Sequence, residues 1–127
     1  MELEECEMRC TILKRRVGEG RYAVRFVGVG TAADFGGKRP PWLWTFDCDA
    51  GVLEIVSGVR PTEGSVCGQI FWLLTGAEPG QDGDTDSAIG RIFSAEVAFD
   101  DDGRRTVRLI DDESRREITI ANTNNVE

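Results

Sequence analysis

The 127-residue sequence contains no histidine, only two lysines and only one tyrosine. Histidine is the commonest general base and a frequent metal ligand, so its absence excludes most catalytic triads and disfavours a zinc site. No run approaches the roughly 18 to 20 consecutive apolar residues of a membrane-spanning helix, and the N-terminus is acidic where a targeting signal would be basic and then apolar. We therefore expect a soluble, cytoplasmic, non-enzymatic protein without a cofactor or a membrane contact.

The four cysteines are Cys6, Cys10, Cys48 and Cys67. Their number and spacing do not resemble a dense secreted disulfide framework. The only close pair has the spacing C-x3-C, which differs from the C-x2-C pairs typical of zinc sites. We interpret Cys48 and Cys67 as small buried hydrophobic residues.

The charge balance is acidic, with 23 Asp and Glu residues against 15 Lys and Arg residues. Binding to a polyanion would therefore require a local basic patch. Thirteen of the 15 basic residues are arginine. This bias suits planar stacking and bidentate phosphate contacts, but a GC-rich genome would also produce it.

One helix is expected at residues 62–75. Apolar residues recur there at i, i+4, i+7 and i+8 from Val66, and Pro61 and Gly76 mark the two ends. This helix stands alone among segments that alternate with the period of a strand.

Five strands surround this helix, and the chain order is β-β-β-α-β-β. The expected strands begin at residue 20 and then cover residues 42–48, 52–57, 89–99 and 104–110, with a possible short extra strand at 117–121. This is the chain order of the OB-fold, a small five-stranded β-barrel. The sequence thus predicts an all-β domain with one helix, in which an OB-like barrel at 18–110 follows an N-terminal arm or extra strand at 1–17 and precedes a tail at 111–127.

The segment 76–88 is rich in glycine and acidic residues, and we expect a mobile loop there. Asp82, Asp84 and Asp86 resemble the start of a calcium-binding loop. The rest of that pattern is absent, because its sixth position is Ser87 where glycine is required. Whether this loop binds a cation or a partner stays open.

Four aromatic residues have two interpretations each. Trp42, Trp44 and Phe46 share one face of a strand, where they form either a stacking platform for bases or part of the barrel core, with Trp42 the most exposed. Trp72 lies opposite the apolar face of the helix. It either covers a loop or the barrel end, or anchors a partner protein.

Basic residues are expected at the loops that flank the binding face of an OB barrel, between the first two strands and between the last two. Arginines on the outer faces of the strands would join the basic loop residues into one basic stripe. Charged pairs at hairpin ends are, however, also common solubility features. The expected nucleic-acid contacts are Tyr22, Arg25, Lys38, Arg39, Trp42, Arg104, Arg105 and Arg108.

Over residues 20–110 the chain resembles small OB-fold proteins of bacteriophage and bacterial genomes. The segments that carry the resemblance are GRYAVRFVGVG, WLWTFDCDAG, PTEGSVCGQIFWLLTG and IGRIFSAEVAFDDDGRRTVRLI. The resemblance implies a serine-initiated helix and non-catalytic binding of single-stranded DNA in replication or recombination. The net charge of −8, without a long acidic tail to account for it, departs from that family.

The alternative function is a protein-interaction module, such as a phage-encoded inhibitor or a subunit of a complex. It would use the acidic surface and Trp72 on the outer face of the helix. A protein partner or self-association is compatible with this alternative.

Overall fold

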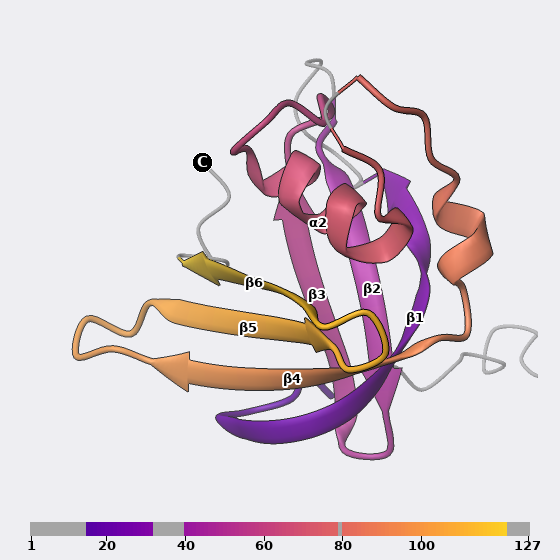
Figure 1. Ribbon diagram of the computed structural model, residues 1–127. Coiled ribbons are helices and arrows are strands. Elements are labelled where there is room, and N and C mark those ends of the chain that lie inside the picture. Colours follow the sequence, from indigo (N-terminus) through magenta and orange to yellow (C-terminus); the bar gives the residue numbers. More distant parts are fainter. Residues whose placement is uncertain (1–14, 32–39, 79, 122–127) are drawn as a thin grey trace, which may run out of the picture.

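The computed structural model describes residues 15–31, 40–78 and 80–121. This part of the chain forms one six-stranded antiparallel sheet with a single α-helix, α2, and one short 3-10 helix, η1 (Figure 1). The elements are β1 (Gly20–Thr31), β2 (Trp42–Cys48), β3 (Gly51–Ser57), α2 (Val66–Thr75), η1 (Thr85–Ala88), β4 (Ile92–Phe99), β5 (Arg105–Asp111) and β6 (Arg116–Ala121). The expectation of an all-β fold with one α-helix is confirmed for the described residues.

The expectation of a closed five-stranded barrel is wrong for this part of the chain. The strand order is β3-β2-β1-β4-β5-β6, so β3 and β6 end the sheet and do not pair with each other. The extra strand considered at 117–121 forms as β6, whose Ile118 and Ile120 face the core. Because β6 pairs along β5, it occupies the strand edge at which β3 would have closed a barrel.

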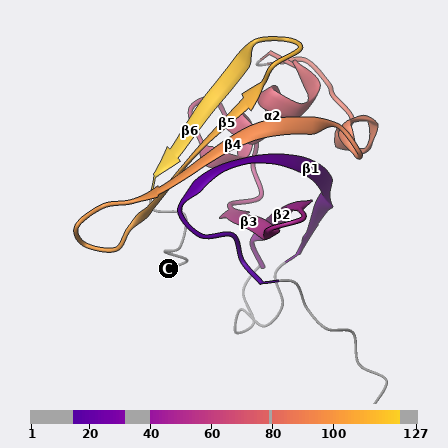
Figure 2. The same ribbon diagram turned by 90° about the horizontal axis from the view of Figure 1, so that it is seen from below.

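Strand β1 bends, and this bend curls the sheet. Its first half, from Gly20 to Arg25, pairs with β4, and its second half, from Arg25 to Thr31, pairs with β2. The register shifts between Phe26 and Gly28, where Gly28 has a φ of 154°. Such a bulge increases the local twist, and Figure 2 shows the resulting curvature of the sheet.

The core lies between the curled sheet and α2, and large aromatic side chains fill it. Phe26, Trp44, Phe46 and Phe93 are almost completely buried and contact one another. The indole nitrogen of Trp44 donates a 2.8 Å hydrogen bond to the hydroxyl of Ser57. Trp44 and Phe46 therefore belong to the core and cannot stack on bases.

Helix α2 begins at Val66, later than the expected start at residue 62. Ser65 caps it, because the Ser65 side chain accepts a 2.9 Å hydrogen bond from the Gly68 backbone nitrogen. The helix ends at Thr75, and Gly76 caps it with a φ of 77° and a backbone N–H that donates to the Trp72 carbonyl. Its buried side chains are Cys67, Ile70, Leu73 and Leu74.

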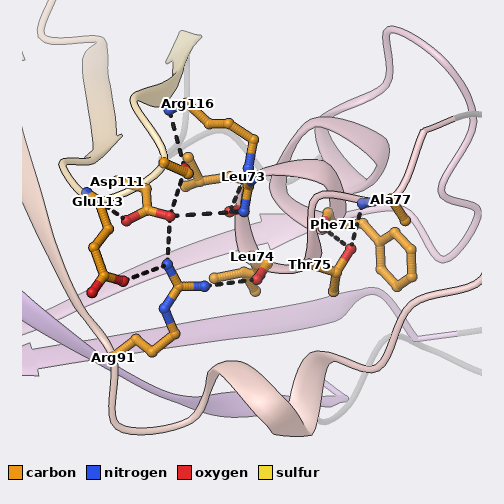
Figure 3. Close-up of polar contacts among 10 residues, drawn as sticks. Phe71, Leu73, Leu74, Thr75, Ala77, Arg91, Asp111, Glu113 and Arg116 are labelled. Atoms are coloured by element: carbon orange, nitrogen blue, oxygen red, sulfur yellow. Dashed lines mark hydrogen bonds and ion pairs between the residues drawn. The ribbon is translucent and has the colours of Figure 1, made fainter.

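A buried carboxylate on β5, Asp111, organises the C-terminal end of α2 (Figure 3). Asp111 is 1% exposed and accepts hydrogen bonds from Arg91, from the Ser114 hydroxyl at 2.7 Å and from the Glu113 backbone at 3.2 Å. Burial alone would raise the pKa of Asp111, but the hydrogen bonds from Ser114 and Arg91 outweigh it and lower the pKa.

Two arginines join this carboxylate to the helix. Arg91 donates to the Leu74 carbonyl at 3.2 Å, and Arg116 donates to the Leu73 carbonyl at 3.1 and 3.3 Å (Figure 3). The final carbonyls of a helix lack intrahelical partners and carry partial negative charge. The guanidinium groups therefore satisfy these carbonyls and fix α2 to the β5–β6 turn. We call Asp111, Arg91 and Arg116 the helix latch.

Two further segments, outside the strands and α2, contain regular structure. The segment expected to be a mobile loop at 76–88 ends in η1, which Asp84 caps by accepting a 3.0 Å hydrogen bond from the Asp86 nitrogen. Before β1, Arg16 forms an isolated parallel bridge with Val52 at the outer edge of β3. Most of the expected N-terminal arm, residues 1–14, lies outside the described residues.

Candidate functional site

The outer face of the sheet, opposite the core, lies over β1, β2 and β3. We define the outer face by the side chains of Arg16, Arg25, Val27, Leu43, Thr45, Asp47, Val52, Glu54 and Val56, which alternate with buried core residues or extend the same rows. All the large aromatic residues of β1 and β2 point to the other side.

One row across the outer face carries an arginine at each end. Arg25 pairs with Asp47, Asp47 pairs with Val52, and Val52 bridges to Arg16. Adjacent strands lie about 4.8 Å apart, so the two arginine positions are separated by roughly 14 Å. The row therefore presents two cationic side chains on either side of the β2–β3 hairpin.

Both of these arginines are exposed, and each contacts a carboxylate. The Arg25 side chain is 57% exposed and lies 3.3 Å from Asp47, and the Arg16 side chain is 69% exposed and lies 3.8 Å from Glu54. The partner side chains of Asp47 and Glu54 are 19% and 31% exposed, so solvent reaches both pairs mainly from the arginine side, and pairs open to solvent contribute little energy. Arg16 and Arg25 can therefore change partners.

The β1 side of the outer face has two positions without a side chain, Gly28 and Gly30. An added Cβ at Gly28 or Gly30 would meet no other atom within 4 Å, so the backbone of β1 is open to solvent there. Beside these glycines, Thr45 pairs with Gly28 and Leu43 pairs with Gly30. A glycine within a strand often marks close approach of a ligand or another backbone.

A hollow of about 230 Å³ lies at the Arg25 end of the outer face. Its lining residues are Ala23, Arg25, Asp47, Cys48, Asp49 and Ile92. The hollow thus combines one guanidinium with two carboxylates, which can accept hydrogen bonds from the amino groups of bases.

Arg105, a predicted contact, is only 5% exposed and donates a 2.6 Å hydrogen bond to the Glu54 carbonyl. Burial and the nearby charge of Arg16 lower the pKa of Arg105. This side chain joins the start of β5 to the edge of β3. Its neighbour Arg104 is exposed in the β4–β5 turn.

Arg108, another predicted contact, lies in a ladder of alternating charges on the outer side of β1, β4, β5 and β6. It contacts Glu117 at 2.8 Å and Glu96 at 3.3 Å, and Glu96 also contacts Arg21 at 3.5 Å. The hydrogen bonds between Arg108 and Glu117 raise the pKa of Arg108 and lower that of Glu117. The charge of Arg108 is therefore largely compensated.

The predicted stacking residues are half-buried. Tyr22 packs against the core, and its hydroxyl donates a 2.9 Å hydrogen bond to the Gly18 carbonyl. Trp42 packs edge-on against Trp44, with the ring centroids 6.0 Å apart. Both rings thus have limited area for stacking. Lys38 and Arg39 lie outside the described residues.

Trp72 of α2 is half-buried and packs against the core, far in sequence from the arginines of the outer face. The guanidinium carbon of Arg116 lies 5.9 Å from the centre of its ring. Trp72 therefore lies on a different element from the predicted nucleic-acid contacts and has different neighbours.

Comparison with protein-family models, curated proteins and solved structures finds no match for this chain. Within the described ranges, no helix has both the length and the apolar character needed to cross a membrane. The same residues contain no group of three or more His, Cys, Asp or Glu side chains placed to hold a metal ion.

Sequence reasoning missed Arg16 and the acidic partners of the predicted arginines. The basic cluster around Arg16 is visible in the sequence, but its place beside β3 depends on a bridge to Val52 that no local pattern indicates. Asp47 lies on the predicted outer side of its strand. Its contact with Arg25 depends on the pairing of β1 with β2.

Proposed function

We propose that the protein binds single-stranded nucleic acid across the outer face, without catalysis. The observation that carries the proposal is the row with Arg16 and Arg25 at its ends and an open backbone beside it at Gly28 and Gly30. Phosphate contacts dominate nucleic-acid affinity, and an open backbone admits sugars and bases close to the chain. The sequence segments that resemble OB-fold proteins of phage genomes suggest the same ligand and a role in replication or recombination, although the sheet of the described residues does not close into the barrel of those proteins.

In this proposal Arg16 and Arg25 contact phosphates, together with Lys38 and Arg39 of the β1–β2 connection. Arg104 contributes less, because it shares its turn with three aspartates at 100–102. Arg105 supports the site from the core side, and Arg108 stays in its charge ladder. Tyr22 and Trp42 add only partial stacking.

The acidic partners set the strength of binding. A phosphate must compete with Asp47 for Arg25 and with Glu54 for Arg16, so we expect weak binding that depends steeply on salt. With one phosphate at each of the four basic side chains that contact phosphates in this proposal, the affinity for a single strand should fall about 50-fold between 50 and 200 mM salt.

Fluorescence anisotropy with a labelled 20-nucleotide single strand tests the proposal. The double variant Arg16→Gln and Arg25→Gln should abolish most of the binding at 50 mM salt and flatten the salt dependence. The matched control is Arg60→Gln with Arg115→Gln, which removes two exposed arginines elsewhere on the surface. Absence of binding by the wild-type protein, or equal losses in both double variants, would refute the proposal.

A further inference from the structure

A groove of about 370 Å³ runs along the outer side of α2, away from the outer face of the sheet. Its floor is helical, and loops on both sides of the helix form its walls. The lining residues are Pro61, Thr62, Glu63, Gly64, Gly68, Gln69, Phe71, Trp72, Ala77, Glu78, Gly80 and Gln81. A volume of this size falls within the range of ligand sites, roughly 300 to 1,000 Å³.

The first wall, residues 61–64, is held tightly against the helix. A Cβ added at Gly68 would lie 2.0 Å from the Thr62 carbonyl oxygen, so only glycine permits this approach. The Ser65 hydroxyl donates to the same carbonyl at 2.7 Å, and the Gln69 amide donates to the Gly64 carbonyl at 3.2 Å. The wall is therefore formed without a ligand.

The second wall follows the end of the helix and is fixed in a similar way. The Thr75 hydroxyl donates to the Phe71 carbonyl at 2.8 Å and accepts from the Ala77 nitrogen at 3.0 Å, as Figure 3 shows. A Cβ added at Gly83 would lie 2.7 Å from the Thr75 hydroxyl oxygen. The loop beyond Ala77 thus packs back onto the helix and keeps the groove open.

Trp72 forms part of the floor, and the helix latch holds it in place. Arg116 stacks over the indole at 5.9 Å while its guanidinium donates to the Leu73 carbonyl and lies 3.7 Å from Asp111. A Trp side chain on the solvent side of a helix exposes a large apolar surface to water, which is unfavourable unless other groups cover it. Here the core and Arg116 cover part of the ring, and Trp72 also lines the groove.

The charged residues among those that line the groove are Glu63 and Glu78, one in each wall. Both are exposed, and Asp82, Asp84 and Asp86 continue the acidic surface beyond the second wall. No lining residue is basic. The nearby Arg116 guanidinium lies 5.9 Å from the centre of the Trp72 ring, which leaves Phe71 as the aromatic residue of the floor with no cation over its ring among the described residues. A phosphate chain would be repelled here, whereas a cation would be attracted by the carboxylates and by the aromatic faces of the floor.

We infer that this groove docks a segment of another protein that places a lysine or arginine side chain over Phe71 and Trp72, between Glu63 and Glu78. The floor extends from Gly68 to Trp72, about 6 Å of helix, which is longer than one amino or guanidinium group. An apolar neighbour of the cation would therefore fill the remaining length. Buried aromatic residues with charge complementarity around them are typical of binding hot spots. The inference is independent of nucleic-acid binding.

Selection from a phage-displayed library of random 12-residue peptides on the intact protein tests this inference. We expect the selected peptides to carry a lysine or arginine next to an apolar residue. The double variant Glu63→Gln and Glu78→Gln should weaken a selected synthetic peptide about 10-fold. The variant Asp101→Asn with Asp102→Asn, which removes two charges from the distant β4–β5 turn, should leave its affinity within 2-fold.

Gln69→Arg places a cation inside the groove and should compete with the peptide, giving at least a 10-fold loss while the circular dichroism spectrum shows that the fold is kept. Selected peptides without a basic residue would overturn the inference. So would an absence of binders, or a peptide whose affinity is unaffected by both groove variants. None of these outcomes depends on whether the protein binds an oligonucleotide.

Discussion

The helix latch gives the sharpest stability prediction, the effect of Asp111→Asn. The substitution keeps the size of the side chain but removes the charge that faces Arg91 and Arg116, and it replaces one acceptor oxygen by a donor. Asp111 is 1% exposed, whereas the Arg91 and Arg116 side chains are 31% and 23% exposed. Breaking a fully buried ion pair costs about 3 to 5 kcal/mol, and partial exposure of the arginines reduces this. We expect a loss of about 3 kcal/mol of unfolding free energy.

Urea unfolding followed by circular dichroism at pH 7 measures this loss, with Asp101→Asn in the exposed β4–β5 turn as the control. The pH dependence of the unfolding free energy gives a second test, and its direction follows from the pKa of Asp111. Because the pKa of Asp111 is lowered in the folded protein, its contribution is present at neutral pH and is lost as the pH falls below about 4. Asp111→Asn should therefore lose less stability than the wild type between pH 4 and pH 2. A loss below 1 kcal/mol at pH 7, or equal effects of the two substitutions, would refute the role of the latch.

Three further predictions concern the outer face and the core. Asp47→Asn should tighten oligonucleotide binding about 3-fold at 50 mM salt, because it removes the competitor of Arg25; weaker binding in the anisotropy assay would count against the proposed interface. Trp44→Phe should lower the unfolding free energy by about 2 kcal/mol, because it removes the hydrogen bond to Ser57 and leaves a cavity; a urea-unfolding change below 0.5 kcal/mol would contradict this. Burial raises the pKa of the Cys67 thiol, so mass spectrometry should find Cys67 unmodified by iodoacetamide in the native protein and modified in 6 M urea; rapid native labelling would contradict its burial.

Local periodicity was sufficient to predict most of the strands. The alternation of Trp42, Trp44 and Phe46 predicted β2 with the bounds that the structure has, because both faces of that strand follow the period of two. In β1 the same alternation did not predict the strand beyond Phe26. There the bulge at Gly28 shifts the alternation, and Gly28 and Gly30 have no side chains to display it.

Barrel closure was not predictable from local pattern. The segment of β6 is short and was recognised only as a possible strand, yet its pairing along β5 decides the edge of the sheet. Competition between β3 and β6 for that edge depends on contacts between segments far apart in the sequence. Chain order alone is therefore insufficient to determine whether a sheet of this kind closes.

The predicted site shows a similar limit. Arg105 alternates with Val107 and Leu109, so the period of two already indicated an inward side chain, and the hairpin position was given too much weight. Arg108 does face outward, as expected. Its carboxylate partners Glu96 and Glu117 lie on neighbouring strands and become visible only once the cross-strand register is known.

The distribution of charge explains how an acidic protein can present two surfaces with opposite preferences. On the outer face the positive charges of Arg16 and Arg25 offset the negative charges of Glu54 and Asp47, while Asp49 adds one more carboxylate at the Arg25 end. The groove on α2 has two carboxylates and no basic lining residue, and an acidic loop follows it. The net charge of −8 is thus a poor guide to either surface. Of these two surfaces, the outer face repels an anionic ligand less, and the groove beside α2 attracts a cationic segment more. For this reason a single experiment at high salt cannot separate the two functions, whereas paired removal of arginines or of glutamates can.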